Sequence, residues 1–179
     1  MNSNKTEELI VFFRNANKSF LADQCGLISS EVSEQCLCAQ LSYYIKISLK
    51  CASLEGYHVD VEYNRNNGKV KTIINDDMKV IKIKCDLIIH SRGERKKDNI
   101  IAIEMKKSYR SETAKNNDKE RLIALTKKDN IWSYDGIVLP EHVCGYDLGI
   151  YYEIDNKKKL ILIEYYTNGC KYSEESINF

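Results

Sequence analysis

Hydrophobic residues in the first third of the chain recur every three or four positions, the spacing of a buried helix face. This spacing predicts one helix over residues 6–22 and a second over residues 30–52. Ser29 or Ser30 is expected to cap the second helix. Glu34 continues the apolar face of that helix by one turn, so its carboxylate is expected to point inward. A solvated carboxylate at the start of the helix is the alternative.

Further along the chain, apolar and polar residues alternate or form short apolar runs, as they do in β-strands. The predicted strands span residues 56–64, 78–90, 99–106, 146–154 and 160–168. A third helix is predicted over residues 116–128, with Asp118 as its cap, and residues 129–145 are expected to be irregular. The order α-α-β-β-β-α-β-β predicts an α/β fold in which α-helices flank a central mixed β-sheet.

Length and composition favour one soluble domain. The chain has 179 residues, of which 43% are hydrophobic and 30% charged, which suffices for a sizeable core. We expect a single domain over residues 1–179, with residues 1–29 as an N-terminal helical extension of a core over residues 30–168. No apolar run approaches membrane-spanning length and no signal-peptide pattern opens the chain, so no membrane contact is expected. Seven cysteines, an odd number, then indicate reduced thiols and a cytoplasmic location.

Charge is distributed unevenly along the chain. The net charge is only +1, yet residues 79–110 hold ten Lys/Arg and four Asp/Glu, a local net charge of +6. A basic region of this kind can attract phosphates, which makes five of its residues candidates for nucleic-acid contact. These candidates are His90, Arg92, Arg95, Lys96 and Lys107, the last expected to be exposed. The alternative is a solvated, lysine-rich hairpin with a histidine at a strand end.

Two carboxylates lie in strands that are otherwise apolar, Asp86 near one end of 78–90 and Glu104 in 99–106. Lys106 is two residues beyond Glu104 and therefore points to the same face of its strand. If the two strands pair, the carboxylates converge and need a cation between them, for which Mg²⁺ suits oxygen ligands. Lys106 could then orient or deprotonate a water, or stabilise charge on a phosphate, as metal-assisted phosphodiester hydrolysis requires. A Glu–Lys pair on a half-exposed strand face is the common alternative.

These residues carry a resemblance to a known family. Asp86 is followed after 17 residues by the triplet "EMK" that begins at Glu104, which resembles the PD-(D/E)XK nucleases of the restriction endonuclease-like fold. The segments "SEQCLCAQLSYYI", "VDVEYNR", "DLIIHSRG" and "IAIEMKKS" resemble, more closely, a group of small bacterial proteins of that superfamily. The resemblance implies an α-β-β-β-α-β core, in agreement with the predicted order. One departure is Cys85, which stands where the family motif has proline.

The resemblance also implies roles for individual residues. Asp86 and Glu104 match the metal-binding carboxylates, Lys106 matches the catalytic lysine, and Glu34 matches a helix glutamate that serves as an additional ligand. Glu62 occupies a motif position of the small-protein group without an assigned role. The implied activity is that of an endonuclease that uses Mg²⁺ or Mn²⁺ and cleaves DNA rather than RNA, alone, as a homodimer or with a partner protein. The alternative is a non-catalytic module of the same fold that binds nucleic acid or protein, for example in phage defence or a mobile element.

Overall fold

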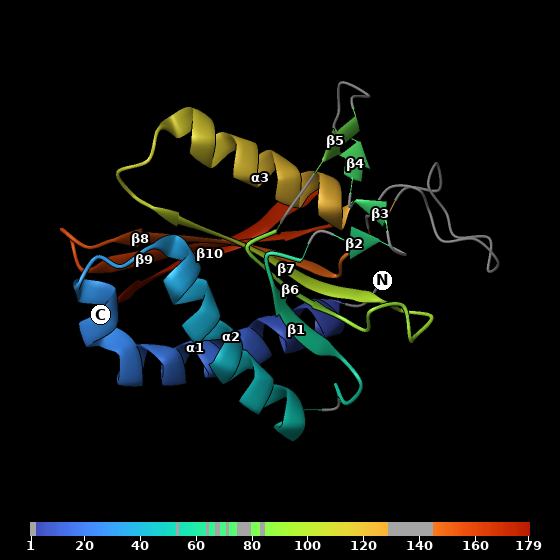
Figure 1. Cartoon of the computed structure of the whole chain (residues 1–179), viewed down its shortest axis with the longest axis horizontal. Coiled ribbons are helices and arrows are strands. Elements are labelled where there is room, and N and C mark those ends of the chain that lie inside the picture. The colour runs from blue at the N-terminus through green and yellow to red at the C-terminus, as the bar shows by residue number, and fades with distance from the viewer. Residues whose placement is uncertain are drawn as a thin grey trace.

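A six-stranded sheet between two helical layers forms the middle of the molecule (Figure 1). The computed structural model describes residues 3–52, 54–63, 65–66, 69–70, 72–74, 80–82, 85–128 and 145–179, and within these it leaves out the side chains of residues 3–4 and 65–82. The helices are α1 (Ser3–Ser29), α2 (Glu34–Cys51) and α3 (Glu112–Thr126). The strands of the sheet are β1 (His58–Val61), β6 (Leu87–His90), β7 (Asn99–Lys107), β8 (Leu148–Asp155), β9 (Leu160–Thr167) and β10 (Cys170–Asn178).

The strands lie side by side in the order β1-β6-β7-β8-β9-β10. Only β7 and β8 are parallel among the pairs of this sheet, and α3 provides the crossover between them. All other neighbours in this sheet pair antiparallel. The predicted α/β architecture, with a mixed sheet flanked by helices, is therefore confirmed.

Two predictions about strands are wrong. The segment 78–90 is not one strand, because β5 (Val80–Lys82) pairs with β4 (Thr72–Ile74) in a separate hairpin and β6 begins at Leu87. A second small hairpin joins β2 (Arg65–Asn66) to β3 (Lys69–Val70). The last strand, β10, was not predicted, because it is an edge strand whose side chains are mostly exposed and whose sequence "CKYSEESIN" lacks a continuous apolar face.

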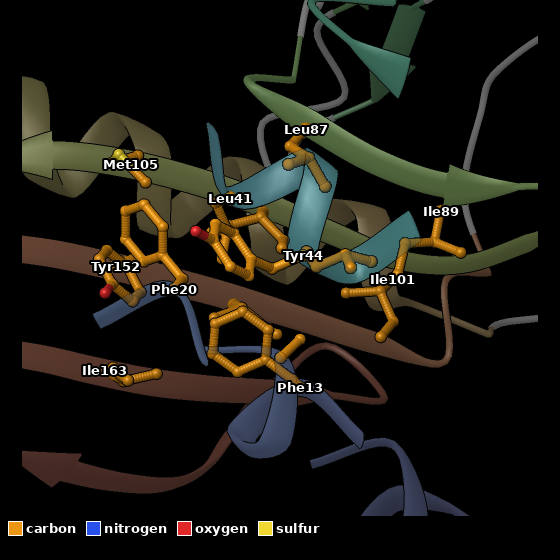
Figure 2. Close-up of a cluster of buried hydrophobic side chains, with 14 of the residues drawn as sticks. Phe13, Phe20, Leu41, Tyr44, Leu87, Ile89, Ile101, Met105, Tyr152 and Ile163 are labelled. Atoms are coloured by element: carbon orange, nitrogen blue, oxygen red, sulfur yellow. The ribbon is translucent and has the colours of Figure 1, made fainter. Parts of the chain in front are cut away.

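The main hydrophobic core lies between the sheet and the layer formed by α1 and α2 (Figure 2). Phe13 and Phe20 of α1 are fully buried there, together with Leu41 of α2 and Met105 of β7. Residues 3–29, predicted to be an N-terminal extension, thus share one hydrophobic core with the segment 30–168. Residues 129–144, predicted to be irregular, lie outside the described part of the chain.

The opposite face of the sheet is covered by α3 and is much more polar. A small apolar cluster there includes Ala102, Leu122 and Leu125. Charged side chains of the strands lie beside it, and α3 supplies cations for them from Lys115 and Lys119. Because buried charges need partners, this face is held together by ion pairs to a degree that the α1/α2 face is not.

Helix starts differ from those predicted. Ser33 caps α2, since its hydroxyl accepts a hydrogen bond from the Cys36 N–H at 3.1 Å. Ser29 belongs to α1, so the expected cap at residue 29 or 30 is wrong. Likewise Ser111 caps α3, and Asp118 is a buried residue in the middle of that helix. More than one serine precedes both α2 and α3, and local sequence alone does not decide which of them is the cap.

Candidate functional site

Asp86 and Glu104 converge at one end of the β6–β7 pair, as the sequence predicted. Leu87 lies opposite Ile103, and continuing this register by one residue brings Asp86 opposite Glu104, where directly opposed Cβ atoms are about 4.5–5.5 Å apart. The Asp86 Oδ2 atom accepts a hydrogen bond from the Met105 N–H at 2.8 Å. The side chain is therefore fixed against β7, next to Glu104 on the face covered by α3.

Glu104 is a buried carboxylate with poor compensation. Only 1% of the residue is exposed, and its Oε1 atom has no hydrogen-bond partner among the described residues. The closest cation is Arg121 of α3, whose Nη1 lies 3.4 Å from Oε1. Burial raises the pKa of Glu104 well above its ordinary value, Arg121 opposes that shift, and the Asp86 charge adds to it. The protein thus keeps an acid at a position where its charged form is costly.

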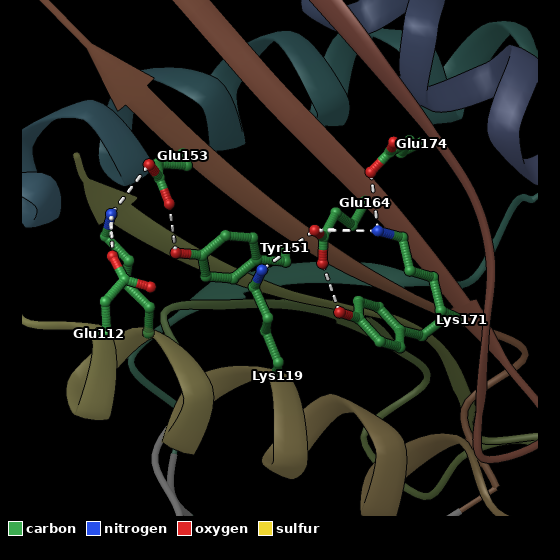
Figure 3. Close-up of polar contacts among 9 residues, drawn as sticks. Glu112, Lys119, Tyr151, Glu153, Glu164, Lys171 and Glu174 are labelled. Atoms are coloured by element: carbon green, nitrogen blue, oxygen red, sulfur yellow. Dashed lines mark hydrogen bonds and ion pairs between the residues drawn. The ribbon is translucent and has the colours of Figure 1, made fainter.

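Glu164 provides a comparison on the same face of the sheet. It lies on β9, two strands away, because Glu104 pairs with Tyr151 and Tyr151 pairs with Glu164. Figure 3 shows that Glu164 is fully engaged: Lys119 and Lys171 each donate to Oε1 at 3.0 Å, and the Tyr166 hydroxyl donates to Oε2. Burial raises the pKa of Glu164, but these three donors outweigh burial and lower it overall.

The contrast separates two kinds of buried carboxylate. Lys115 and the Tyr151 hydroxyl satisfy Glu153 in the same way, at 3.1 and 2.8 Å. Glu164 and Glu153 thus each have several donors within hydrogen-bond distance on this face. Among the described residues Glu104 has no such donor at Oε1, which is the expected state of a carboxylate kept for a ligand.

Lys106 is held by a residue that the sequence interpretation did not assign to the site. Its Nζ lies 2.8 Å from Asp118 Oδ2, and Asp118 Oδ1 accepts a hydrogen bond from Arg121 Nη2 at 2.6 Å. Burial lowers the pKa of Lys106, but its contacts with Asp118 outweigh burial and raise it. Lys106 is therefore a cation in this arrangement.

Asp118 and Arg121 could have been found from the spacing of α3. Asp118 lies four residues before Leu122 and seven before Leu125, on the helix face that packs on the sheet. The assignment of Asp118 as a helix cap concealed this relation. Arg121 is three residues from Asp118, which allows the two side chains to meet.

Glu34 reaches the same end of β7 from the other side of the sheet. Its Oε1 atom accepts a hydrogen bond from the Lys107 N–H at 2.9 Å and one from Arg110 Nε at 3.2 Å. Its inward orientation at the start of α2 agrees with the prediction. The negative charge of Glu34 also contributes to the pKa shifts of Asp86 and Lys106, so these three residues form one electrostatic group.

Glu62 directly follows β1 and lies next to Asp86. Its N–H donates to the Asp86 carbonyl oxygen at 3.0 Å, and its Oε2 accepts a hydrogen bond from Gln35 at 3.0 Å. Glu62 has a φ of 54°, a left-handed conformation that costs about 1 kcal/mol or more for a residue with a side chain. Burial raises the pKa of the Cys38 thiol, and Asp86, Glu104, Glu34 and Glu62 all add to that rise.

The residues predicted to contact nucleic acid lie elsewhere. The loop with Arg92, Arg95 and Lys96 joins β6 to β7 at the far end of the pair from Asp86. Glu104 is five residues from the start of β7, about 17 Å at 3.4 Å per residue. All three basic residues are exposed. The basic loop is therefore separate from the carboxylates.

Two other predicted contacts are wrong for this structure. His90 is 2% exposed, and its Nε2 lies 2.9 Å from Asp60 Oδ2. Lys107 was predicted to be exposed, but only 3% of the residue is exposed, and burial lowers the pKa of its amine. Both side chains lie within the packed layers, where a nucleic acid cannot reach them. Lys107 is buried because its side of β7 packs under α2, and the alternation of side chains along the strand alone does not reveal this packing.

Asp60 also holds the basic loop. Arg92 donates two hydrogen bonds to its carboxylate, at 2.6 and 2.8 Å. Burial raises the pKa of Asp60, but the hydrogen bonds from Arg92 and His90 outweigh burial and lower it to about 2. The loop is thus anchored to β1 by a charged pair.

The donor set of the site fits a hard divalent cation in chemical type. Asp86, Glu104 and Glu34 offer only oxygen, and among the described residues the Oε1 atom of Glu104 has no hydrogen-bond donor. Across the described ranges, however, no three His, Cys, Asp or Glu side chains already form a group that could hold a metal ion. Instead, Arg121, Arg110 and backbone N–H groups hold the carboxylates, so a metal ion would compete with these donors.

Comparisons with known proteins add no relative. No protein-family model, no curated protein and no solved structure matches the chain. None of the helices described is both long enough and apolar enough to cross a membrane.

Proposed function

We propose that this protein is a metal-dependent nuclease of the PD-(D/E)XK type, with the restriction endonuclease-like fold, that hydrolyses phosphodiester bonds in DNA. The observation that carries the proposal is the buried, incompletely compensated Glu104 beside Asp86 and Lys106. On the same face, Glu164 and Glu153 have lysine and tyrosine donors within hydrogen-bond distance, whereas Glu104 Oε1 has none among the described residues. The resemblance of the Asp86 and Glu104 motifs adds support.

In this proposal Asp86 and Glu104 would hold Mg²⁺ or Mn²⁺, with Glu34 as an additional ligand. The bound cation would supply a Lewis acid for the phosphate. Lys106 would hydrogen-bond the attacking water or a phosphate oxygen. While Asp118 raises the pKa of Lys106, the lysine acts as a cationic donor rather than as a base. Asp118 is therefore a positioning residue for Lys106.

The test is cleavage of plasmid and of labelled oligonucleotides with Mg²⁺ or Mn²⁺. Asp86→Ala, Glu104→Gln and Lys106→Ala should each lower the rate by about 100-fold or more. Glu164→Gln is the matched control, since it alters a buried carboxylate of the same face and should leave the rate within a few-fold of wild type. Cleavage that survives all three site substitutions would contradict the proposal.

A second function has its own support. The carboxylates are held by arginines and N–H groups in this structure, and Lys106 is paired with Asp118, as in a non-catalytic module that binds nucleic acid or protein. Calorimetric titration with Mn²⁺ separates the two functions. Binding that disappears in Glu104→Gln and persists in Glu164→Gln supports the nuclease. Absence of Glu104-dependent binding supports the module.

A further inference from the structure

A cavity of about 570 Å³ lies between the C-terminal part of α2 and the start of β1, away from the carboxylates. In Figure 1 the end of α2 lies next to β1, and α2 is on the side of the sheet opposite α3. The volume is in the range of ligand-binding pockets. Its apolar walls include Tyr43, Ile47 and Tyr57, of which Tyr43 is 58% exposed and Ile47 is 46% exposed. Two large apolar side chains are thus open to a ligand at one place.

The rim of this cavity is basic. Lys46 and Lys50, one helical turn apart on α2, both line it and are exposed. Within the described residues neither lysine forms an ion pair. Arg92 of the β6–β7 loop also lines the cavity, but its charge is paired with Asp60, and Glu55 is the acidic residue of the lining. The uncompensated charge at the cavity is therefore positive, and it complements an anion.

The walls are held in position by the basic loop. Tyr57 donates a hydrogen bond from its hydroxyl to the Lys97 carbonyl at 2.8 Å, and the Arg95 guanidinium lies 5.4 Å from the centre of the Tyr57 ring. Arg95 also packs against Gly56, where a Cβ atom would lie 2.2 Å from Nη2. Gly56 has a φ of 81°, so the backbone favours glycine there, and a larger residue would also displace the Arg95 guanidinium. The cavity is a preformed feature of the fold.

We propose that this cavity binds one unpaired nucleotide of a nucleic-acid strand, with the base against Tyr43 and the phosphates against Lys46 and Lys50. Aromatic rings that stack on bases beside a row of cations are the general means of binding single strands. The proposal rests on the proposed function, because it gives that function a substrate class: nucleic acid with a single-stranded segment.

The position of the cavity relative to Glu34 supports a shared strand. Glu34 and Lys46 lie on one helix, twelve residues or about 18 Å apart. At the duplex spacing of about 3.4 Å per nucleotide this distance corresponds to roughly five nucleotides, and an extended single strand spans it with fewer. A short strand is therefore long enough to extend from the cavity to Glu34.

The test measures binding of a labelled 12-nucleotide single strand by fluorescence anisotropy in EDTA, where cleavage is absent. The Lys46→Glu/Lys50→Glu protein should bind at least tenfold more weakly than wild type. The slope of log affinity against log salt should also become shallower by about 1.4, because about 0.7 is lost for each phosphate contact to a single strand. Lys18→Glu, which changes an exposed lysine on α1, should bind as wild type does. Tyr43→Ala should weaken binding about tenfold without changing the slope.

Three outcomes would overturn the proposal. The first is equal affinity of the double variant and Lys18→Glu. The second is a blunt duplex that competes as well as the single strand does. The third is an acidic peptide of equal charge that competes equally well, which would point to a protein partner. Absence of binding that depends on Lys46 and Lys50, together with intact Glu104-dependent cleavage, would overturn the cavity assignment alone. Lysine-dependent binding without cleavage would overturn the nuclease and leave the cavity assignment.

Discussion

Glu104→Gln should stabilise the metal-free protein at neutral pH. Burial is the main cause of the raised pKa of Glu104, and it outweighs the attraction of Arg121 at 3.4 Å. A carboxyl whose folded pKa is raised contributes its stability below the unfolded pKa and loses it as pH rises. Glutamine keeps the shape of the side chain and removes the charge that becomes costly. The substitution therefore removes a penalty rather than a favourable contact.

The size of the effect follows from linkage. Each pH unit above the ordinary glutamate pKa of 4.5 can add up to about 1.4 kcal/mol, so the gain is near zero at pH 4.5 and at most roughly 3–4 kcal/mol at pH 7. For a chain of this size, each 1 kcal/mol corresponds to roughly 2–4 °C in Tm. Urea and thermal denaturation in EDTA between pH 4.5 and 8 measure both quantities.

Glu164→Gln is the control, and it should have the opposite sign. It weakens the contacts with Lys119, Lys171 and Tyr166, and should cost roughly 1–3 kcal/mol at pH 7. If Glu104→Gln instead destabilises the protein at pH 7, the Glu104–Arg121 pair is structural and the reasoning fails. A gain of equal size at pH 4.5 and pH 7 would also refute it, because the charge would not be its cause.

Three further outcomes are expected. Asp118→Asn should lower the pKa of Lys106, and amine-specific labelling of Lys106 at pH 8–9 should become faster; an unchanged rate would mean that Asp118 does not hold the ammonium. In the folded protein the pKa of Asp60 is lowered from 3.8 to about 2. The contribution of Asp60 to the free energy of unfolding is therefore complete above about pH 4 and is lost as the pH falls toward 2. Asp60→Asn should therefore cost about 2 kcal/mol at pH 7, and its difference from wild type should vanish near pH 2 in acid titrations of stability. Phe13→Ala should cost about 3–5 kcal/mol in urea unfolding, and a cost below 1 kcal/mol would mean that α1 is peripheral.

Periodicity determined much of the fold in advance. The apolar spacing of α1 and α2, the runs of β6 and β7, and the final pair of strands were sufficient to predict an α/β fold with a mixed sheet, because burial of one face imposes these patterns on the sequence. The apolar pattern did not predict elements that lie at the edge of the main sheet or outside it. The edge strand β10 has no apolar face, and the hairpin of β4 and β5 stands outside the main sheet.

The convergence of Asp86, Glu104 and Lys106 was also predictable, because a period of two fixes which side chains share a face and adjacent strands bring them together. What the sequence alone could not give was the partner of each charge. Only the packing of α3 on the sheet decided that Asp118 binds Lys106 and that Arg121 approaches Glu104, since these contacts join segments that a crossover connects. The packing of α2 likewise decided that Lys107 is buried. Strand alternation assigns a side chain to a face, and tertiary structure decides whether that face meets water, a helix or an opposite charge.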